Sequence, residues 1–394
     1  MISKNLKIWA VSAASSVLAS VALAAPDMPG GPRNGQWTLT EPATASARAQ
    51  ADLHVWLMWL CVIIFIGVFS VMFYSIWAHR KSRGFKPADF HESTSVEIAW
   101  TIIPFIIVVG MGVVATGEVV SQKDTSNADI TVKAVGYQWK WGYEYINGTG
   151  EGISFLSTLA TPRDQIDDKA FPGARARREA NPYYLMEVDN PLVVPVNKKV
   201  RIVTTANDVI HSWYVPALGV KQDAIPGFVR DAWFRAEKVG TFRGECAELC
   251  GKEHAFMPIV VEVKSEADYA KWVEAKQKEM AASRDDPNKE WQLAELSARG
   301  EKVYASNCVA CHQATGKGVP GAFPALAGSK VVLGPQQGQI ELMLKGRTGT
   351  AMASFKQLSD VELAAVITYT RNAWTNKADD NIVQPKEVLA ARGK

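Results

Sequence analysis

The chain has 394 residues, of which 47% are hydrophobic and 21% are charged, so it is long enough for about two or three domains. Its net charge of +3 is too small to indicate a nucleic-acid-binding protein. The 5 cysteines are too few over this length for a disulfide scaffold, and four of them form two close pairs, each beside a histidine, which favours cofactor ligation.

The N-terminus has the pattern of a secretory signal peptide. Lys4 and Lys7 precede a stretch of small and apolar residues that ends in Ala-Leu-Ala, and we assign residues 1–24 to the signal. A third membrane span is the alternative interpretation. The stretch is short for a span and is rich in Ser and Ala, which favours the signal peptide.

Two uncharged apolar runs follow, at Val55–Ala78 and Ile98–Gly117. Each is long enough to cross a hydrocarbon core of about 30 Å, so residues 50–120 are predicted to form a transmembrane hairpin rather than a buried soluble one. The loop between the runs is basic, which places it in the cytoplasm and both ends outside the membrane. Its basic residues are Arg80, Lys81, Arg83 and Lys86.

A β-rich domain is predicted over residues 125–265. Short alternating or β-branched runs are separated by Gly, Pro and Asn-Asp turns, which is typical of an antiparallel sandwich or barrel. Residues 148–182 interrupt this rhythm with a polar segment that we interpret as a surface insertion, and we assign it no chemistry.

The C-terminal part is predicted to be helical. Residues 266–296 are charged and helix-prone and are read as a linker, and residues 297–376 as a small all-α domain. Ser359 is the expected N-cap of its last helix. Apolar side chains expected near one face of that helix are Leu363, Val366, Ile367 and Trp374.

The more specific of the two cysteine clusters is "CVACH", because C-x-x-C-H is the attachment motif of c-type haem. Cys308 and Cys311 would bind the haem vinyl groups, and His312 would ligate the iron. A thioredoxin-like redox pair and half of a zinc site are the alternatives, but no β-α-β pattern surrounds the motif and no further Cys pair follows it.

An electron-transfer haem needs a sixth ligand, and Met raises its potential. Met343 lies in an apolar helical segment, where core packing is the default. Met352 lies in a Gly-containing loop before the last helix and is therefore the preferred ligand. The carbonyl of Pro324 is expected to accept a hydrogen bond from the second ring nitrogen of His312.

The first cluster, "GECAELCGKEHAFM", contains Cys246, Cys250, His254 and Met257. Two thiolates, an imidazole and a thioether suit copper better than zinc, for which Met is a poor ligand. Two cysteines could bridge two copper ions if a second histidine were nearby. His211, at a strand end in "VIHSWYVP", is the remaining histidine of the β region.

At this point the residues show a family resemblance. "EVDNPLVVPV", "DVIHSWYVPALGVKQDAIPG", "GECAELCGKEHAFMPIVVEV", "VEIAWTIIP" and "GYQWKWGYEY" resemble subunit II of haem–copper cytochrome c oxidases, over about residues 50–275. The last domain resembles a class I cytochrome c. The combination is similar to bacterial caa3-type oxidases, in which a cytochrome c is fused to subunit II.

The resemblance implies a dinuclear copper A centre in a cupredoxin-like barrel. Its implied ligands are Cys246 and Cys250 as bridges, His211 and Met257 on one copper, and His254 and the backbone carbonyl of Glu248 on the other. The Glu248 side chain would reach a magnesium ion shared with subunit I.

The resemblance also implies roles for Trp139 and Glu97. Trp139 corresponds to the tryptophan at which electrons enter the centre, and Glu97 to an acid near the mouth of a proton channel in subunit I. Trp139 and its neighbour Trp141 could instead be core aromatics, and Glu97 could merely end a span at the membrane interface.

The function implied is that of an electron-transfer subunit. Haem c would pass electrons to copper A and then to subunit I for proton-translocating reduction of oxygen. Implied partners are subunits I and III, a cytochrome c or bc1 donor, and the lipid bilayer. Two alternatives stay open: the copper A subunit of a nitric oxide reductase, and a tethered cytochrome in copper delivery or redox sensing.

Overall fold

The computed structural model describes residues 28–33, 35–86, 89, 91–166, 168, 171–282, 286, 289–347 and 349–393. The predicted signal peptide, residues 1–24, lies outside the described residues. The chain divides into two compact units with their main boundary after Ala270. The first holds two long helices and a β domain, and the second is helical.

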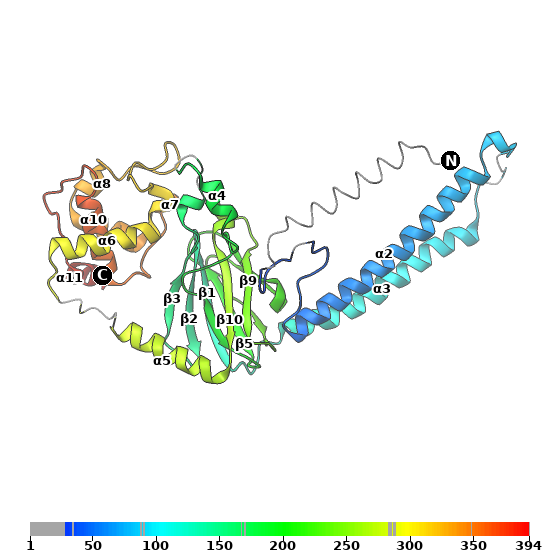
Figure 1. Ribbon diagram of the computed structural model, residues 1–394, viewed down its shortest axis with the longest axis horizontal. Helices are drawn as coiled ribbons and strands as arrows, with labels where there is room; N and C mark the ends of the chain where they lie inside the picture. The colour runs from blue at the N-terminus through cyan, green and yellow to red at the C-terminus, as the bar shows by residue number, and fades with distance from the viewer. Residues whose placement is uncertain are drawn as a thin grey trace. The chain divides into compact units, whose positions relative to one another are not determined.

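Helices α2 (Ala45–Ala78) and α3 (Thr94–Lys123) form the predicted hairpin (Figure 1). Both are long and apolar enough to cross a membrane, and their apolar windows are not buried within the protein. Helix α2 begins at Thr44, whose hydroxyl accepts a hydrogen bond from the Ala47 amide. The same hydroxyl donates to the carbonyl of Leu218, which joins the start of the helix to the β domain.

The β domain is a sandwich of two five-stranded sheets. One sheet has the strand order β3-β2-β1-β5-β8 and the other has the order β4-β10-β9-β6-β7. Large side chains such as Trp141, Tyr143, Trp213 and Phe234 are buried between the sheets. The strands are β1 (Ile130–Tyr137), β2 (Lys140–Asn147), β3 (Ser154–Ser157), β4 (Leu192–Pro195), β5 (Val200–Ala206), β6 (His211–Val215), β7 (Val220–Ala224), β8 (Arg230–Phe234), β9 (Gly240–Cys246) and β10 (Pro258–Lys264).

Strand β9 lies between β6 and β10 and pairs antiparallel with both. In the register, Cys246 is opposite Trp213 of β6, and Glu245 is opposite Pro258 of β10. The close approach of β9 to β6 depends on Gly244, because a Cβ there would lie 1.9 Å from the Tyr214 carbonyl oxygen. Cys246, the last residue of β9, is therefore held by β6, and the residue before it, Glu245, is paired on both sides.

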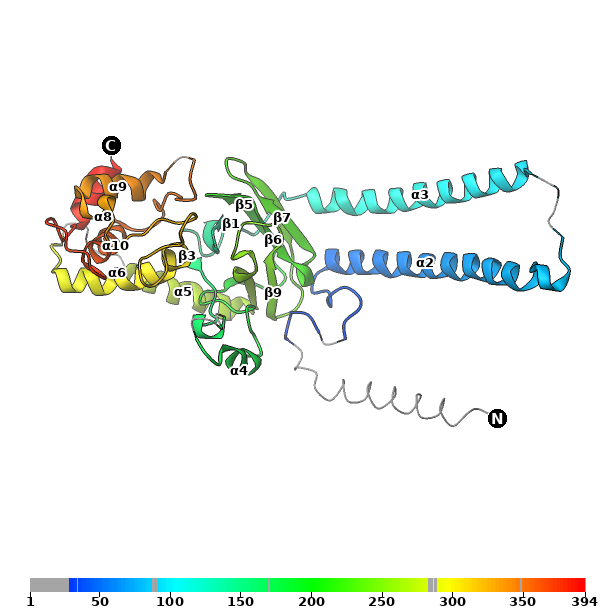
Figure 2. The ribbon, with the colours of Figure 1, turned by 90° about the horizontal axis from the view of Figure 1, so that it is seen from above.

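The predicted insertion, residues 148–182, is wrong at its start, because Ser154–Ser157 form β3, which pairs with β2. The polar insertion lies between β3 and β4 and carries the short helices η2 (Arg163–Gln165) and α4 (Ala174–Glu179) (Figure 2). An antiparallel bridge between Leu159 and Val188 closes its base. The Asp189 carboxylate accepts hydrogen bonds from the amide and the hydroxyl of Thr158 at the same place. The insertion is thus a closed loop with a defined stem.

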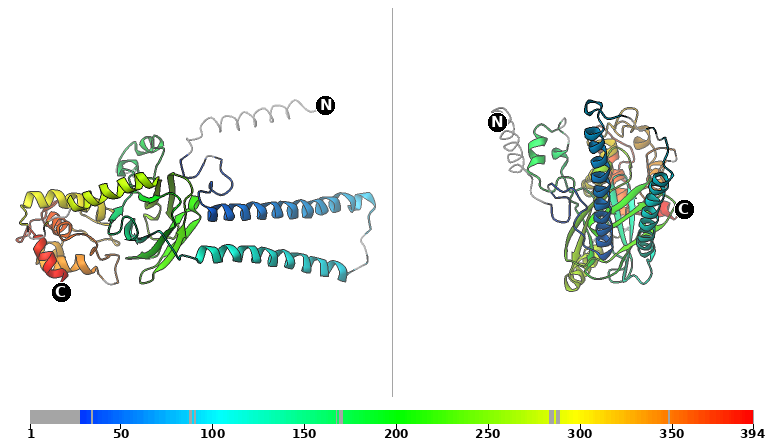
Figure 3. Two further views of the ribbon diagram at one scale, coloured as in Figure 1. Left: turned by 90° about the horizontal axis from the view of Figure 1, so that it is seen from below. Right: turned by 90° about the vertical axis from the view of Figure 1, so that its right-hand side faces the viewer.

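The helical unit is drawn in yellow to red (Figure 3). Helices α6 (Leu293–Asn307) and α10 (Asp360–Asn372) cross at Gly300, where a Cβ would lie 2.0 Å from the Ala365 carbonyl oxygen. Their contact buries Leu296 and Val361. The other helices are α7 (Val309–His312), α8 (Lys330–Leu333), α9 (Gln336–Lys345) and α11 (Pro385–Arg392).

Helix α10 confirms the predicted N-cap and corrects one residue of the predicted face. Ser359 and Glu362 form a capping box, and Leu363 and Val366 are buried. Trp374 does not share this face, because the backbone turns extended at Ala373 and Trp374 itself has φ +59°. Its ring instead packs against two tyrosines, and its Nε1 donates to the Ala314 carbonyl at 2.9 Å.

The segment predicted as a linker is partly taken up by the two units. Helix α5 (Glu266–Ala282) begins on the barrel, where the Tyr269 hydroxyl donates to the Thr149 carbonyl at 2.6 Å. At the other end, Trp291 exchanges two hydrogen bonds with the Gln384 side chain in the helical unit. The chain between these two attachment points, Tyr269 and Trp291, includes most of α5.

Candidate metal centres

The first cluster forms where three neighbouring strands begin or end. Strand β6 begins at His211 and β9 ends at Cys246. The chain then makes a loop that carries Cys250 and the short helix η4 (His254–Phe256), and Met257 directly precedes β10. Because β6, β9 and β10 are adjacent in one sheet, their ends bring these five side chains together.

The distances confirm that the five side chains converge. The two Sγ atoms of Cys246 and Cys250 are 3.9 Å apart and are not joined in a disulfide. His211 Nδ1 lies 3.9 Å from Cys246 Sγ, and His254 Nδ1 lies 3.5 Å from Cys250 Sγ. Met257 Sδ is 3.6 Å from Cys250 Sγ. Two imidazoles and three sulfurs thus surround one small volume.

Burial and charge suit this volume to a soft metal. His211, Cys246, Cys250 and Met257 are all buried, while His254 is half-buried. The pKa of the Cys246 thiol is lowered by its hydrogen bonds to the Cys250 and His211 side chains and to nearby backbone, against the opposing effect of burial. A thiolate is the ligating form of cysteine. The donors fit copper, which favours soft sulfur and imidazole ligands.

Glu248 faces the cluster with its backbone rather than its side chain. Its carbonyl oxygen lies 3.3 Å from Cys246 Sγ. Its carboxylate is exposed, beside Leu249, which is 78% exposed. Backbone and side chain therefore face different surroundings, and the copper and magnesium roles of Glu248 stay predictions.

Trp139 touches the same loop. Its ring is buried, and its Nε1 donates to the Cys250 carbonyl oxygen at 3.1 Å. Trp141 is fully buried, and its ring packs edge-on against His211 with 6.0 Å between centroids. Both tryptophans are core aromatics, and Trp139 is in addition hydrogen-bonded to the backbone of a cluster cysteine. Its role in electron transfer stays a prediction.

Glu97 lies far from this cluster in the chain, in the first turn of α3. Its carboxylate accepts a hydrogen bond from the Ser93 amide at 3.4 Å, and the residue is exposed on this chain. A carboxylate in the first helical turn is favourable because it faces the positive end of the helix dipole. This hydrogen bond caps the N-terminal end of α3. The role of Glu97 at a proton channel stays a prediction.

The second cluster occupies the short helix α7. Cys308 and Cys311 are half-buried and form no disulfide among the described residues, so two thiols and His312 are presented within one turn. His312 Nδ1 lies 2.9 Å from the Pro324 carbonyl oxygen, which confirms the predicted hydrogen bond and leaves Nε2 for a metal. Burial lowers the pKa of His312, and the Pro324 hydrogen bond opposes this. Its neutral, ligating form is therefore favoured.

The two candidate methionines differ in their surroundings. Met343 is buried on α9, as expected for a core residue. Met352 is half-buried in the loop between α9 and α10, and its carbonyl accepts a hydrogen bond from the Arg347 amide at 2.8 Å. Gly346, with φ +70°, allows this close return of the loop, since a Cβ there would lie 2.7 Å from the Met352 oxygen.

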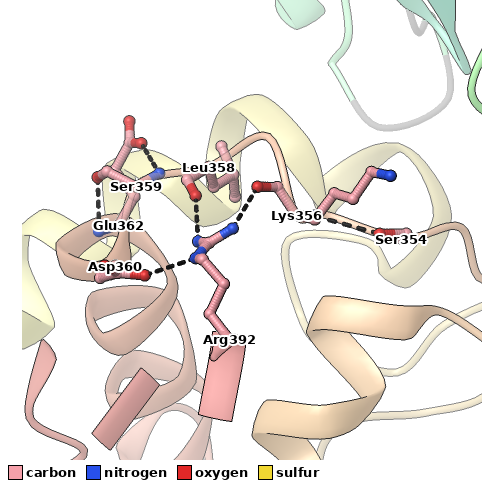
Figure 4. Close-up of polar contacts among 7 residues, drawn as sticks. All are labelled: Ser354, Lys356, Leu358, Ser359, Asp360, Glu362 and Arg392. Atoms are coloured by element: carbon pink, nitrogen blue, oxygen red, sulfur yellow. Dashed lines mark hydrogen bonds and ion pairs between the residues drawn. The ribbon is translucent and has the colours of Figure 1, made fainter. Parts of the chain in front are cut away.

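The end of the same loop is fixed by the last helix (Figure 4). Arg392 of α11 donates to the carbonyl oxygens of Lys356 and Leu358 at 2.6 and 2.8 Å, and its Nε lies 2.8 Å from the Asp360 carboxylate. The predicted domain ended at residue 376, so this contact was not expected. An isolated Arg near a C-terminus carries no local signal of such a partner.

Comparison with known proteins gives matches over most of the chain. The family "Cytochrome C oxidase subunit II, periplasmic domain" matches residues 130–264, and the corresponding transmembrane domain matches residues 32–116. Cytochrome c oxidase subunit 2 of Cereibacter sphaeroides is 40% identical over 273 residues, which are 68% of this chain and 87% of the relative. The chain belongs to the cytochrome c oxidase subunit II family.

A second relative agrees with this assignment. Cytochrome c oxidase subunit 2 of Cyanidium caldarium is 36% identical over 60% of this subunit II and 89% of its own length. The solved periplasmic domain of subunit II of cytochrome oxidase of Bradyrhizobium japonicum is 43% identical, covers 39% of this chain and 98% of its own, and has a TM-score of 0.33.

This subunit II also carries a cytochrome domain. The family "Cytochrome C oxidase, cbb3-type, subunit III" matches residues 295–369. The combination is a caa3-like fusion, with a two-helix membrane domain, a cupredoxin-like periplasmic domain and a C-terminal cytochrome c domain. The families imply copper A in the periplasmic domain, haem c in the last domain, an electron-transfer role, and subunit I as a partner.

Proposed function

We propose that this subunit II accepts electrons at a covalent haem c and delivers them through a dinuclear copper A centre to subunit I, which reduces oxygen and translocates protons. The observation that carries the proposal is the buried cluster in which His211, Cys246 and Cys250 place their ligand atoms within 4.8 Å of one another. A dinuclear centre shares one electron between two ions, which lowers the reorganisation that transfer requires.

The proposed copper ligands are those whose atoms converge. Cys246 and Cys250 bridge the two ions, and His211 and Met257 bind one of them. His254 and the Glu248 carbonyl bind the other. Support comes from the close sulfur and nitrogen distances and from the lowered pKa of the Cys246 thiol, which makes the ligating form available.

The proposed haem site uses the residues of α7 and the following loops. Cys308 and Cys311 attach the macrocycle covalently, and His312 holds the iron through Nε2. The Pro324 carbonyl fixes the orientation of the His312 ring. Met352 is the proposed sixth ligand, supported by its half-buried place in a loop, in contrast to the buried Met343.

Further roles complete the proposal. The Glu248 side chain binds magnesium shared with subunit I, and its exposure leaves it available to a partner. Trp139 lies where electrons enter copper A, supported by its hydrogen bond to the Cys250 carbonyl. Glu97 lies near a proton channel of subunit I. Subunit III, a cytochrome c or bc1 donor, and the bacterial inner membrane are the remaining proposed surroundings.

The short connection between the two units favours the fused haem as the immediate donor. Treated as a flexible chain, the roughly 20 residues between Tyr269 and Trp291 span about 25 Å root-mean-square. A tether of this length keeps the haem at an effective concentration on the order of millimolar near copper A. A free donor at micromolar concentration would have to dock far more tightly to compete.

Rapid-mixing spectroscopy on the intact oxidase tests the proposal. A soluble donor should reduce the haem first and copper A afterwards. Cys311→Ala, which removes one haem attachment, should slow copper A reduction by at least about tenfold, corresponding to about 1.4 kcal/mol of activation free energy. If a haem-free Cys311→Ala oxidase reduces copper A as fast as wild type, the fused domain is not on the electron path.

A further inference from the structure

A buried acid sits next to a proposed copper ligand and is paired with an arginine from the insertion. Glu253 directly precedes His254, and its side chain is 11% exposed. Both its carboxylate oxygens accept from the Arg163 guanidinium, with Nη1–Oε1 and Nη2–Oε2 distances of 3.1 and 2.9 Å. A bidentate pair of this kind fixes both position and orientation.

Glu253 is also part of the backbone frame of the copper loop. The Phe256 amide donates to the Glu253 carbonyl at 2.8 Å, and the His254 amide donates to the Gly251 carbonyl at 3.2 Å. These two bonds shape the turn that carries His254 toward Cys250 and leads to Met257. A movement of Glu253 would therefore move the ligand that follows it.

Arg163 is itself held in place from the insertion side. It begins η2, and the next residue, Asp164, is bound by Arg177 through both its carbonyl oxygen and its carboxylate. Together with the closed stem at Leu159 and Val188, these contacts keep the insertion from swinging freely. The backbone that carries the Arg163 guanidinium is therefore held in place by contacts within the insertion.

We propose that Arg163 is a positioning residue, and that the insertion latches the copper loop through the Arg163–Glu253 pair. Without the guanidinium, the buried Glu253 carboxylate would lose both hydrogen bonds from Arg163, and the loop would open to expose the carboxylate to water. With the Arg163 guanidinium in place, His254 and Met257 keep their positions before copper binds. Bound copper is then released slowly. The role rests on the proposed copper site.

Hydrogen–deuterium exchange of the copper-free full chain in detergent tests the latch without metal. Arg163→Gln should speed exchange of the His254 and Phe256 amides, and alkylation of Cys250 by iodoacetamide, by at least about tenfold. Arg163→Lys keeps the charge but not the bidentate geometry, so its exchange and alkylation rates should lie between those of wild type and Arg163→Gln. The matched control is Arg175→Gln, since Arg175 lies in the same insertion and pairs only with exposed Glu179 among the described residues.

Pairwise coupling separates a latch from general destabilisation. In a Glu253→Gln background, Arg163→Gln should have little further effect on exchange, because both changes remove the same contact. Equal exchange in wild type and Arg163→Gln would overturn the latch, as would full additivity of the two changes. Glu253→Gln and Arg163→Lys keep the test decisive if Arg163→Gln does not fold.

The copper-loaded chain gives a second readout. Transfer of copper to excess EDTA is measured by the loss of the bound-copper absorbance. It should be about tenfold faster in Arg163→Gln than in wild type or Arg175→Gln. Unchanged release would overturn the claim that the pair retains copper. A wild-type chain that binds no copper would contradict the proposed function, whereas the exchange experiment would still decide the latch.

Discussion

At the scale of single residues, the two metal clusters differ in how they could be inferred. The haem motif is local, so Cys308, Cys311 and His312 are identified by spacing alone. The copper cluster needs His211, which is 35 residues from Cys246 in the chain and reaches it only because β6 and β9 pair. Arg163 and Glu253 are 90 residues apart, and no local pattern links them.

The distal haem ligand gives a prediction at this scale. Met352→Leu should leave the haem covalently attached, open the sixth coordination position and lower the reduction potential, because thioether ligation raises it. Visible spectra of the ferric protein and redox titration measure both effects. Met343→Leu is the control, since a Leu–Met exchange in a core costs less than about 1.5 kcal/mol. Loss of Met ligation in the control alone would contradict the assignment.

At the scale of elements, periodicity and turn residues predicted most of the fold. Both membrane helices, the capped helix α10 and strands β1, β2, β4, β5, β9 and β10 follow from local pattern, whereas β3 lies within residues 148–182, which were predicted as an insertion. The position of Trp374 did not follow from local pattern, because the helix ends at Asn372 and a positive φ turns the chain away. Helix α11 was missed because its buried Val388 and its Arg392 contacts are tertiary.

Helix α11 gives the second prediction. Arg392→Ala should free the segment that follows the Met352 loop, because three hydrogen bonds from one guanidinium are lost together. We expect the cytochrome domain to lose about 1–3 kcal/mol of unfolding free energy, together with weaker Met ligation. Thermal unfolding of the full chain, followed by haem absorbance, measures the loss.

The control lies on the same helix. Lys386 forms an exposed ion pair with Glu290, and such pairs contribute at most about 1 kcal/mol. Lys386→Ala should therefore leave the haem spectrum unchanged. If it weakens Met ligation as much as Arg392→Ala does, then α11 acts through its overall docking and not through the arginine contact.

At the scale of the whole molecule, the ligands of the two metal centres fall into different compact units. Ligands within one unit depend on the packing of that unit, so the two centres should assemble independently. Cys246→Ser should abolish the copper signal and keep the covalent haem, and Cys311→Ala should do the reverse. Metal analysis and pyridine–haem spectra of exported protein measure each cofactor. Loss of both from either change would contradict independent assembly.

The position of β9 has a consequence for how this subunit tolerates changes in chain length. Side chains alternate faces along a strand, so one residue added before Cys246 would point its thiol away from His211. Because β9 is hydrogen-bonded to a strand on each edge, it cannot change its register by one residue without breaking pairs with β6 or β10. The insertion, closed at its stem by Leu159 and Val188, can gain or lose residues beyond Arg163 without disturbing any strand. Evolutionary changes of length in this domain should therefore concentrate in the insertion and spare the strand that ends in the copper cluster.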